Sequence, residues 1–219
     1  LFVNREGAVS FPEIGPIQVA GLTFAQMKEE LQSLLDGQLI GTRASITLGQ
    51  LRSIRIFVLG DVNRPGSFTV SGLSTMTNAL FASGGVTPVG SLRRVELKRQ
   101  GRTVSELDLY DLLLRGDNRD DVRLQPGDVI FVPPRGDTVA VAGEVQRPAI
   151  YELQGEKALD QVIQLAGGLT AAAYPGKVRI ERIDPDRARS VLIADLVSAA
   201  GRGTTVRNGD VVLVDPVLE

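Results

Sequence analysis

The sequence predicts an α+β fold in which two tandem β-grasp modules follow a partial α/β domain. Three observations carry this prediction: an internal repeat, the same order of strand and helix signals in each copy, and an opening segment that does not match the repeat. The expected domains are residues 1–51, 54–134 and 138–217. With 43% hydrophobic residues among 219, the chain can bury one sizeable core or several small ones.

The repeat is visible by eye. Residues 60–68 (GDVNRPGSF) reappear as residues 143–151 (GEVQRPAIY), an offset of 83 residues. Between 57–99 and 140–182, 11 of 43 positions are identical, whereas about 3 would be expected by chance from average residue usage. Near the end of each copy the offset changes by one, and PGDVIFV at 126–132 matches NGDVVLV at 208–214. We interpret this as a duplication.

Each copy contains the same order of local signals. A β-branched strand (54–59 and 139–142) meets an Arg-Pro turn, and a short strand and an amphipathic helix follow. Gly84-Gly85 and Gly167-Gly168 are expected to end these helices. Two strands, a short apolar segment (109–114 and 192–197), a Gly-Asp turn and a closing strand complete the unit. The buried helix positions are expected to be Met76, Ala79, Leu80 and Ser83 in the first copy, and Leu159, Val162, Ile163 and Ala166 in the second.

The opening segment is predicted to contain a strand and turn over 8–15, a helix, and a strand over 44–48. Thr23 and Gln26 form a capping box at the start of the helix, and Asp36-Gly37 is expected to end it. The expected buried stripe consists of Phe24, Met27, Leu31, Leu34 and Leu35. The chain begins without a Met or a leader pattern, so we expect it to be a piece of a longer protein.

Composition excludes several classes of function. Lys+Arg 24 against Asp+Glu 26 gives a net charge of -2, which argues against a nucleic-acid partner. With His 0 and Cys 0, the chain has no histidine or thiolate chemistry for catalysis or for metal binding. Two groups of acidic residues are interpreted as polar loops, because neither has the pattern of a calcium loop or of a facing acid pair. They are Asp117, Asp120 and Asp121, and Asp184 and Asp186. The sequence therefore predicts no enzyme, no cofactor and no metal site.

Two stretches resemble a known family. The run GAVSFPEIG at 7–15, followed by VAGLT at 19–23, resembles the export domain of Wza-like outer-membrane polysaccharide export proteins. The runs at 60–68 and 143–151 resemble the signature of SLBB modules, the soluble-ligand-binding β-grasp family, with Ala149 in place of the second glycine. The order of an export domain followed by SLBB modules is also that of the family.

The resemblance implies a periplasmic, ring-forming and non-enzymatic subunit of a conduit for capsule polysaccharide or exopolysaccharide. It implies a homo-oligomeric ring, polysaccharide as the transported substrate, an inner-membrane copolymerase as a partner, and association with the outer membrane through segments outside this chain. One alternative is a soluble periplasmic module that binds glycan without forming a pore. Another is an accessory domain of a redox enzyme, although this chain has no cysteine or nucleotide-binding motif for the cofactors.

The candidate contact residues lie in the repeated turns and in one strand. As a functional hypothesis, they contact glycan or a neighbouring subunit, and the candidates are Asn63, Arg64, Gln146, Arg147, Arg94 and Lys98. The competing interpretation is an ordinary β-turn with a solvated Arg, and a solvated sheet face for the cationic cluster of Arg93, Arg94, Lys98, Arg99 and Arg102. The Arg135-Gly136-Asp137 tripeptide is interpreted as a linker, and the glycine pairs as helix caps rather than phosphate cradles.

Overall fold

The computed structural model describes residues 3–4, 6–11, 14–38, 45–47 and 52–217. The chain divides into two compact units, Leu1–Leu51 and Arg52–Glu219. The second unit contains both repeats, which we call module 1 (54–134) and module 2 (138–217).

The first unit consists of a small antiparallel hairpin and one helix. Its elements are β1 (Ala8–Phe11), β2 (Gly15–Gln18) and α1 (Phe24–Gln38). The capping box is confirmed, because the backbone N–H of Thr23 donates to Gln26 Oε1 at 2.9 Å and that of Gln26 donates to Thr23 Oγ1 at 3.3 Å. Leu31 and Leu35 are buried as predicted.

Three expectations for this unit are wrong. The helix continues through Asp36-Gly37 to Gln38, since a single glycine costs a helix only about 1 kcal/mol relative to alanine. Phe24 is exposed rather than buried, because it lies in the first turn at the end of the stripe. Residues 45–47 form no strand, and the rest of the predicted 44–48 strand, like Pro12 and Glu13 of the family motif, lies outside the described residues.

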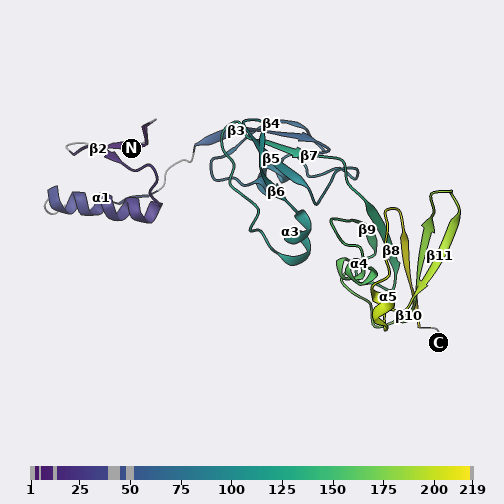
Figure 1. Ribbon diagram of the computed structural model, residues 1–219. Coiled ribbons are helices and arrows are strands. Elements are labelled where there is room, and N and C mark those ends of the chain that lie inside the picture. The colour runs from purple at the N-terminus through teal and green to yellow at the C-terminus, as the bar shows by residue number, and fades with distance from the viewer. Residues whose placement is uncertain (1–2, 5, 12–13, 39–44, 48–51, 218–219) are drawn as a thin grey trace. The chain divides into compact units, whose positions relative to one another are not determined.

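Module 1 is a five-stranded mixed sheet with a helix across one face. The sheet order is β4-β3-β7-β5-β6, in which β3 and β7 are parallel and the other pairs are antiparallel (Figure 1). The elements are β3 (Ser53–Gly60), β4 (Gly66–Ser71), α2 (Met76–Ala82), β5 (Val95–Arg99), β6 (Arg102–Leu107), α3 (Leu109–Arg115) and β7 (Val129–Val132).

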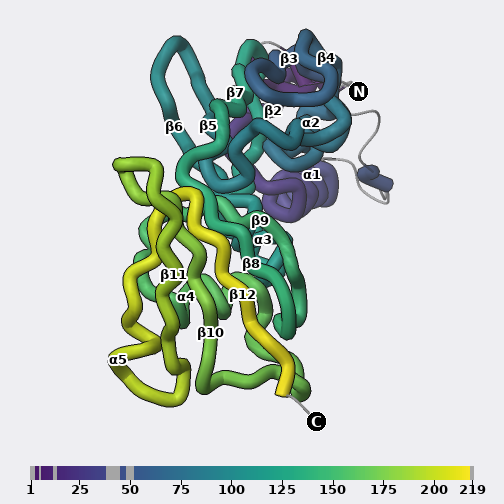
Figure 2. The backbone as a smooth tube through the Cα atoms, turned by 90° about the vertical axis from the view of Figure 1, so that its right-hand side faces the viewer, coloured from purple at the N-terminus to yellow at the C-terminus, as the bar shows by residue number. Residues whose placement is uncertain are grey.

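Module 2 repeats this topology strand for strand. Its order is β9-β8-β12-β10-β11, again with one parallel pair, β8 and β12 (Figure 2). The elements are β8 (Thr138–Gly143), β9 (Ala149–Glu152), α4 (Leu159–Leu165), β10 (Ala173–Ile183), β11 (Arg189–Ala194), α5 (Ala199–Arg202) and β12 (Val211–Pro216). The predicted α+β fold with tandem β-grasp modules is therefore confirmed.

Each helix packs on its sheet through the predicted stripe. The buried stripe residues are Met76, Ala79, Leu80 and Ser83 in module 1 and Leu159, Val162, Ile163 and Ala166 in module 2. The glycine pairs follow α2 and α4 with positive φ angles, as expected for helix ends. The opposite face of each sheet leaves large apolar side chains exposed, among them Phe57, Leu59, Val191 and Ile193.

The predicted alignment of residues 192–197 with 109–114 is wrong. Leu192 lies within β11, and the true counterpart of Leu109 is Leu196, because the Leu109 N–H donates to Leu92 O and the Leu196 N–H donates to Pro175 O in the same way. The hairpin between β10 and β11 is longer than that between β5 and β6. The extra length shifts the repeat offset after residue 182.

Gly60 and Gly143 show why the repeat retains glycine at the end of the first strand. Both have positive φ angles, 86° and 84°. A Cβ atom would lie 2.0 Å from the carbonyl oxygen of Val132 in module 1 and 2.0 Å from that of Val214 in module 2. Only glycine allows the closing strand to approach this closely.

Candidate functional site

The repeated turn arginines lie against the C-terminal ends of the module helices. Arg64 Nη2 donates a hydrogen bond to Ala82 O at 2.8 Å, and Arg147 Nη2 donates to Leu165 O at 3.3 Å. Both acceptors are carbonyls of the last helical residue, where the helix dipole is negative. Each arginine therefore acts as a side-chain cap, a role that neither interpretation of the sequence foresaw.

The amides beside these arginines anchor the same turns. Asn63 Nδ2 donates to Gly84 O at 2.7 Å, and Gln146 Nε2 donates to Leu169 O at 3.2 Å. Since these bonds use only part of each side chain's donors, a contact of the four turn residues with glycan or another subunit stays a prediction.

Arg94 and Lys98 lie apart from the turns, on the strand β5 and the loop before it. Arg94 is exposed. Lys98 pairs with Glu96 at 2.9 Å, and its Nζ atom lies 5.0 Å from the centre of the Phe131 ring. No hydrogen bond or ion pair found among the described residues joins either cation to the turn residues. Their role in binding also stays a prediction.

Arg99 is not an unpaired charge, and it belongs to a kind of ion pair that each module contains. Two hydrogen bonds of 2.8 Å join its guanidinium to Asp128. Arg182 binds Asp210 in the same way, at 2.9 and 2.7 Å, and these hydrogen bonds raise the pKa of each arginine. Each pair connects the third strand of a module to the turn before its last strand. The repeated Arg and the repeated Gly-Asp were the signal that could have revealed it.

Arg93 is also buried, and it connects the two modules. Its Nε and Nη2 atoms donate to Asp108 Oδ2 at 3.0 Å within module 1. Its Nη1 atom donates to both carboxylate oxygens of Glu156 in module 2 at 2.8 Å, and to Glu152 O at 3.2 Å. The prediction of a solvated sheet face is therefore wrong for Arg93, because two carboxylates compensate its burial.

Glu152 provides the return connection from module 2 to module 1. One carboxylate oxygen accepts from Ser91 Oγ and from the Gly136 N–H, both at 2.8 Å, and the other accepts from the Leu92 N–H at 3.0 Å. Gly136 belongs to the predicted Arg-Gly-Asp linker, so this linker is held to both modules.

Two tyrosines fill the space beside these charges. The rings of Tyr110 and Tyr151 meet edge to face with their centres 6.3 Å apart. The Arg93 guanidinium lies 4.8 Å from the centre of the Tyr110 ring, a cation–π distance. Tyr110 comes from module 1, yet it is buried in the hydrophobic core of module 2, and burial raises the pKa of its hydroxyl.

The environment of Glu156 favours its charged form. Desolvation by burial is the largest single influence and acts to raise its pKa. The hydrogen bonds from Arg93 and from the Gln154 N–H, with the attraction of the Arg93 charge, outweigh this and hold the pKa below the ordinary value. The ion pair between the modules is therefore intact at neutral pH.

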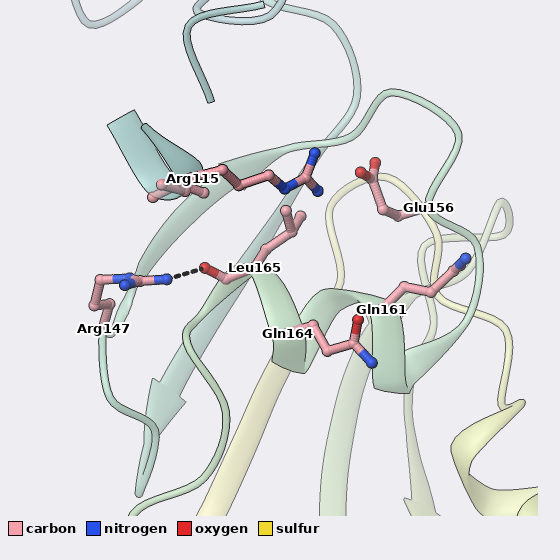
Figure 3. Close-up of a pocket in the computed structure, with 7 residues that line it drawn as sticks. Arg115, Arg147, Glu156, Gln161, Gln164 and Leu165 are labelled. Carbon is pink, nitrogen blue, oxygen red and sulfur yellow. Dashed lines mark hydrogen bonds between the residues drawn. The ribbon is translucent and has the colours of Figure 1, made fainter. Parts of the chain in front are cut away.

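A cavity of about 350 Å³ opens beside this junction. The end of α3 lines it from module 1, and α4 with the turns next to it lines it from module 2. In Figure 3, Arg115 reaches toward Glu156, and Arg147 is bonded to the carbonyl of Leu165. The lining residues are Leu114, Arg115, Arg147, Glu156, Gln161, Gln164 and Leu165.

Sequence reasoning found only one of these cavity residues, Arg147. Arg93 and Tyr110 have no counterpart in the second copy, where the same places hold Gly176 and Val197. A comparison of the two repeats therefore gives no signal for a contact that occurs once.

In the described part of the chain, no helix is both long enough and apolar enough to span a bilayer.

Comparison with family models finds three matches along the chain. Residues 1–49 match the polysaccharide biosynthesis/export protein family, and residues 54–132 and 138–194 each match the SLBB domain.

Curated relatives agree with these matches. An "EPS I polysaccharide export outer membrane protein EpsA" from Ralstonia solanacearum is 30% identical over 222 residues, which cover 97% of this chain and 59% of the relative. A "Polysialic acid transport protein KpsD" from Escherichia coli is 30% identical over 157 residues, which cover 70% of this chain and 28% of the relative. The chain therefore spans 59% or less of the length of these two relatives.

Proposed function

Because this chain belongs to the polysaccharide export family with SLBB domains, we propose that it is the periplasmic section of an outer-membrane conduit for capsule polysaccharide or exopolysaccharide. In this proposal it is a non-enzymatic subunit that forms a homo-oligomeric ring. The exported polysaccharide is its substrate, and an inner-membrane copolymerase delivers that polysaccharide.

The uncovered sheet faces are the observation that carries this proposal. A sheet face in contact with water normally carries polar side chains. Here Phe57 and Leu59 of β3 are each 39% exposed, and Val191 and Ile193 of β11 are 54% and 65% exposed. Exposed apolar residues gathered on one face are typical of protein–protein contact surfaces.

The junction between the modules supports the same proposal. A ring closes only if every subunit presents its contact surfaces at the same angle. Arg93 and Glu152 hold the two modules together through buried hydrogen bonds, which favours a fixed geometry over a flexible linker.

Cysteine cross-linking tests the ring, and these 219 residues contribute no native cysteine of their own. Single cysteines at Phe57 and at Ile193 are placed on the uncovered faces of the full-length protein. A cysteine at Phe81, which is 60% exposed on α2, serves as the control. We expect a short bifunctional thiol reagent to give a covalent dimer from the face variants, since one thiol per subunit can form only one cross-link, and none from the control.

Sedimentation measurements give the second test. We expect the full-length protein in detergent to be a closed oligomer, and the 219-residue chain to be a monomer or a weak dimer, since stable interfaces bury on the order of 1,600 Å². A full-length protein that stays monomeric would overturn the conduit and favour a soluble glycan-binding module.

A further inference from the structure

The cavity beside the module junction has the chemical properties of a ligand site rather than of a packing gap. Its volume of about 350 Å³ lies within the range of roughly 300–1,000 Å³ that small-molecule sites occupy. Two leucines contribute apolar surface, and two arginines, two glutamines and one glutamate contribute polar groups. Such a mixture suits a molecule with both an apolar face and many hydroxyl groups.

The hydrogen-bonding groups of the cavity that remain free are mostly donors. The Arg147 side chain makes one hydrogen bond, to Leu165 O, and has no ion pair with any described carboxylate. Arg115 pairs with Asp111, which lies outside the cavity lining, and 63% of its side chain is exposed. A guanidinium has five donors, so each arginine can bind a further anionic group.

The acceptors in the cavity are largely occupied. Glu156 already accepts from Arg93 and from the Gln154 N–H. Gln161 Oε1 accepts from the N–H groups of Lys157 and Ala158, which leaves its amide NH₂ as a donor. A ligand that brings a carboxylate and hydroxyl oxygens matches this arrangement better than a neutral or cationic ligand does.

Module 1 provides an internal comparison that separates binding from folding. Arg64 makes the same helix-capping bond as Arg147, so capping alone accounts for an arginine at both positions. At the position of Gln164, however, module 1 has an exposed phenylalanine, Phe81. At the position of Glu156 it has Leu73. Gln164 and Glu156 are therefore polar only in module 2, whereas Gln161, like its counterpart Asn78, accepts from the backbone N–H that precedes its helix.

We propose that this cavity binds one carboxylate-bearing sugar unit of the transported polysaccharide. Arg147 and Arg115 pair with the carboxylate, Gln161 and Gln164 donate to hydroxyl oxygens, and Leu114 and Leu165 contact the apolar face of the ring. The proposal rests on the export function for the source of the sugar. Weak binding is expected, because a site along a transport path must also release its cargo.

Titration of the purified 219-residue chain tests this proposal. Trigalacturonic acid and a hyaluronan tetrasaccharide are the acidic probes, maltotriose is the neutral probe, and sodium sulfate is the anion control. Arginine Nε–H signals and the backbone amides of 161–165 are followed by NMR. We expect at least one acidic probe to bind saturably with a Kd of about 1 mM, and maltotriose to bind at least tenfold more weakly.

Variants locate the binding and control for folding. Arg147→Gln and Arg115→Gln should each weaken acidic-probe binding at least fivefold. Arg64→Gln loses the same helix cap in module 1 and should leave binding unchanged. Arg115 takes part in no cap, so its variant reports on the cavity even where Arg147→Gln loosens α4.

Four results would overturn the assignment: no binding of either acidic probe, equal binding of maltotriose, equal loss on Arg64→Gln, or displacement by sulfate at the same concentration as the sugar. Any of these would leave the ring and the export function intact, because those are measured on the full-length protein. Conversely, probe binding by a protein that never forms a ring would keep the cavity site and overturn the conduit.

Discussion

The two modules have the same fold but differ at one surface, and this difference separates the residues that fold a module from those that join modules. In module 1, Ser91, Arg93 and Tyr110 form the surface that contacts module 2. The corresponding surface of module 2 has Tyr174, Gly176 and Val197. Tyr174 is 48% exposed and Val197 is 68% exposed.

One capping hydrogen bond beneath these two surfaces is the same. Asp108 Oδ1 accepts from the Tyr110 N–H, and Asp195 Oδ1 accepts from the Val197 N–H, both at 2.8 Å. Module 2 reaches the same sheet order with other side chains at the remaining places. The fold therefore does not need the junction residues, and the contact between the modules is an addition to a unit that is complete without it.

The largest expected effect concerns the Arg–Asp ion pair that occurs once in each module. Arg182→Met leaves Asp210, which is 1% exposed, without its cation, and should lower the free energy of unfolding by about 3–5 kcal/mol. Arg99→Met also leaves a buried carboxylate, Asp128, without its cation. It should cost only about 1–2 kcal/mol, because the Arg99 side chain is 30% exposed, against 8% for Arg182, and water partly replaces the pair.

Urea unfolding gives the total change, and hydrogen exchange of peptides from β7 and β12 assigns it to a module. Arg119→Met, which removes a fully exposed arginine that pairs with Asp117, is the control and should have no measurable effect. If Arg182→Met and Arg99→Met lower the free energy of unfolding equally, the exposure of the arginine does not determine the cost of losing the ion pair.

This asymmetry also indicates how far the sequence alone could lead. The fold was predictable, because its signals are local in the sequence. They are the Gly84-Gly85 and Gly167-Gly168 pairs, the capping box at Thr23 and the alternating strands. The shared ion pair was predictable in principle, since Arg and Gly-Asp recur in both copies. Arg93 and Tyr110 were not, because they interact with residues about 40 to 60 positions away that no repeat or local pattern reveals.

The second effect concerns the junction alone. Arg93→Met leaves Asp108 and Glu156 facing each other without a cation, and should weaken the contact between the modules by about 2–3 kcal/mol. The module cores should keep their protection from hydrogen exchange, while the Gly136 and Leu92 amides should lose theirs. Arg94→Met, at the exposed neighbouring position, is the matched control. Loss of protection throughout module 1 would mean that Arg93 is part of its fold after all.

A smaller effect follows from the pKa of Glu156. Because this pKa is lower in the folded protein than in the unfolded chain, Glu156 stabilises the junction above the ordinary carboxylate pKa of about 4.3, and this stabilisation is lost as the pH falls through the folded value. The chain has Tyr 3 and Trp 0, and two of the tyrosines meet at the junction. Near-ultraviolet circular dichroism should therefore change below about pH 4, and Glu156→Gln should reduce that change. A profile that Glu156→Gln leaves unaltered would assign the transition to another group.

The smallest effect is expected to be the same in both modules. Arg64→Gln and Arg147→Gln each remove one hydrogen bond to the last carbonyl of a helix, and each should lower the free energy of unfolding by about 0.5–1 kcal/mol, measured by urea unfolding. Equality matters here because the two arginines have the same role in the fold, whereas only Arg147 lines the cavity between the modules. If their stability changes match while their effects on acidic-sugar binding differ, the binding difference cannot come from the helix cap. If Arg147→Gln instead costs much more than Arg64→Gln, the surroundings of Arg147 depend on it for packing, and the cavity would be a structural feature of the junction rather than a site for cargo.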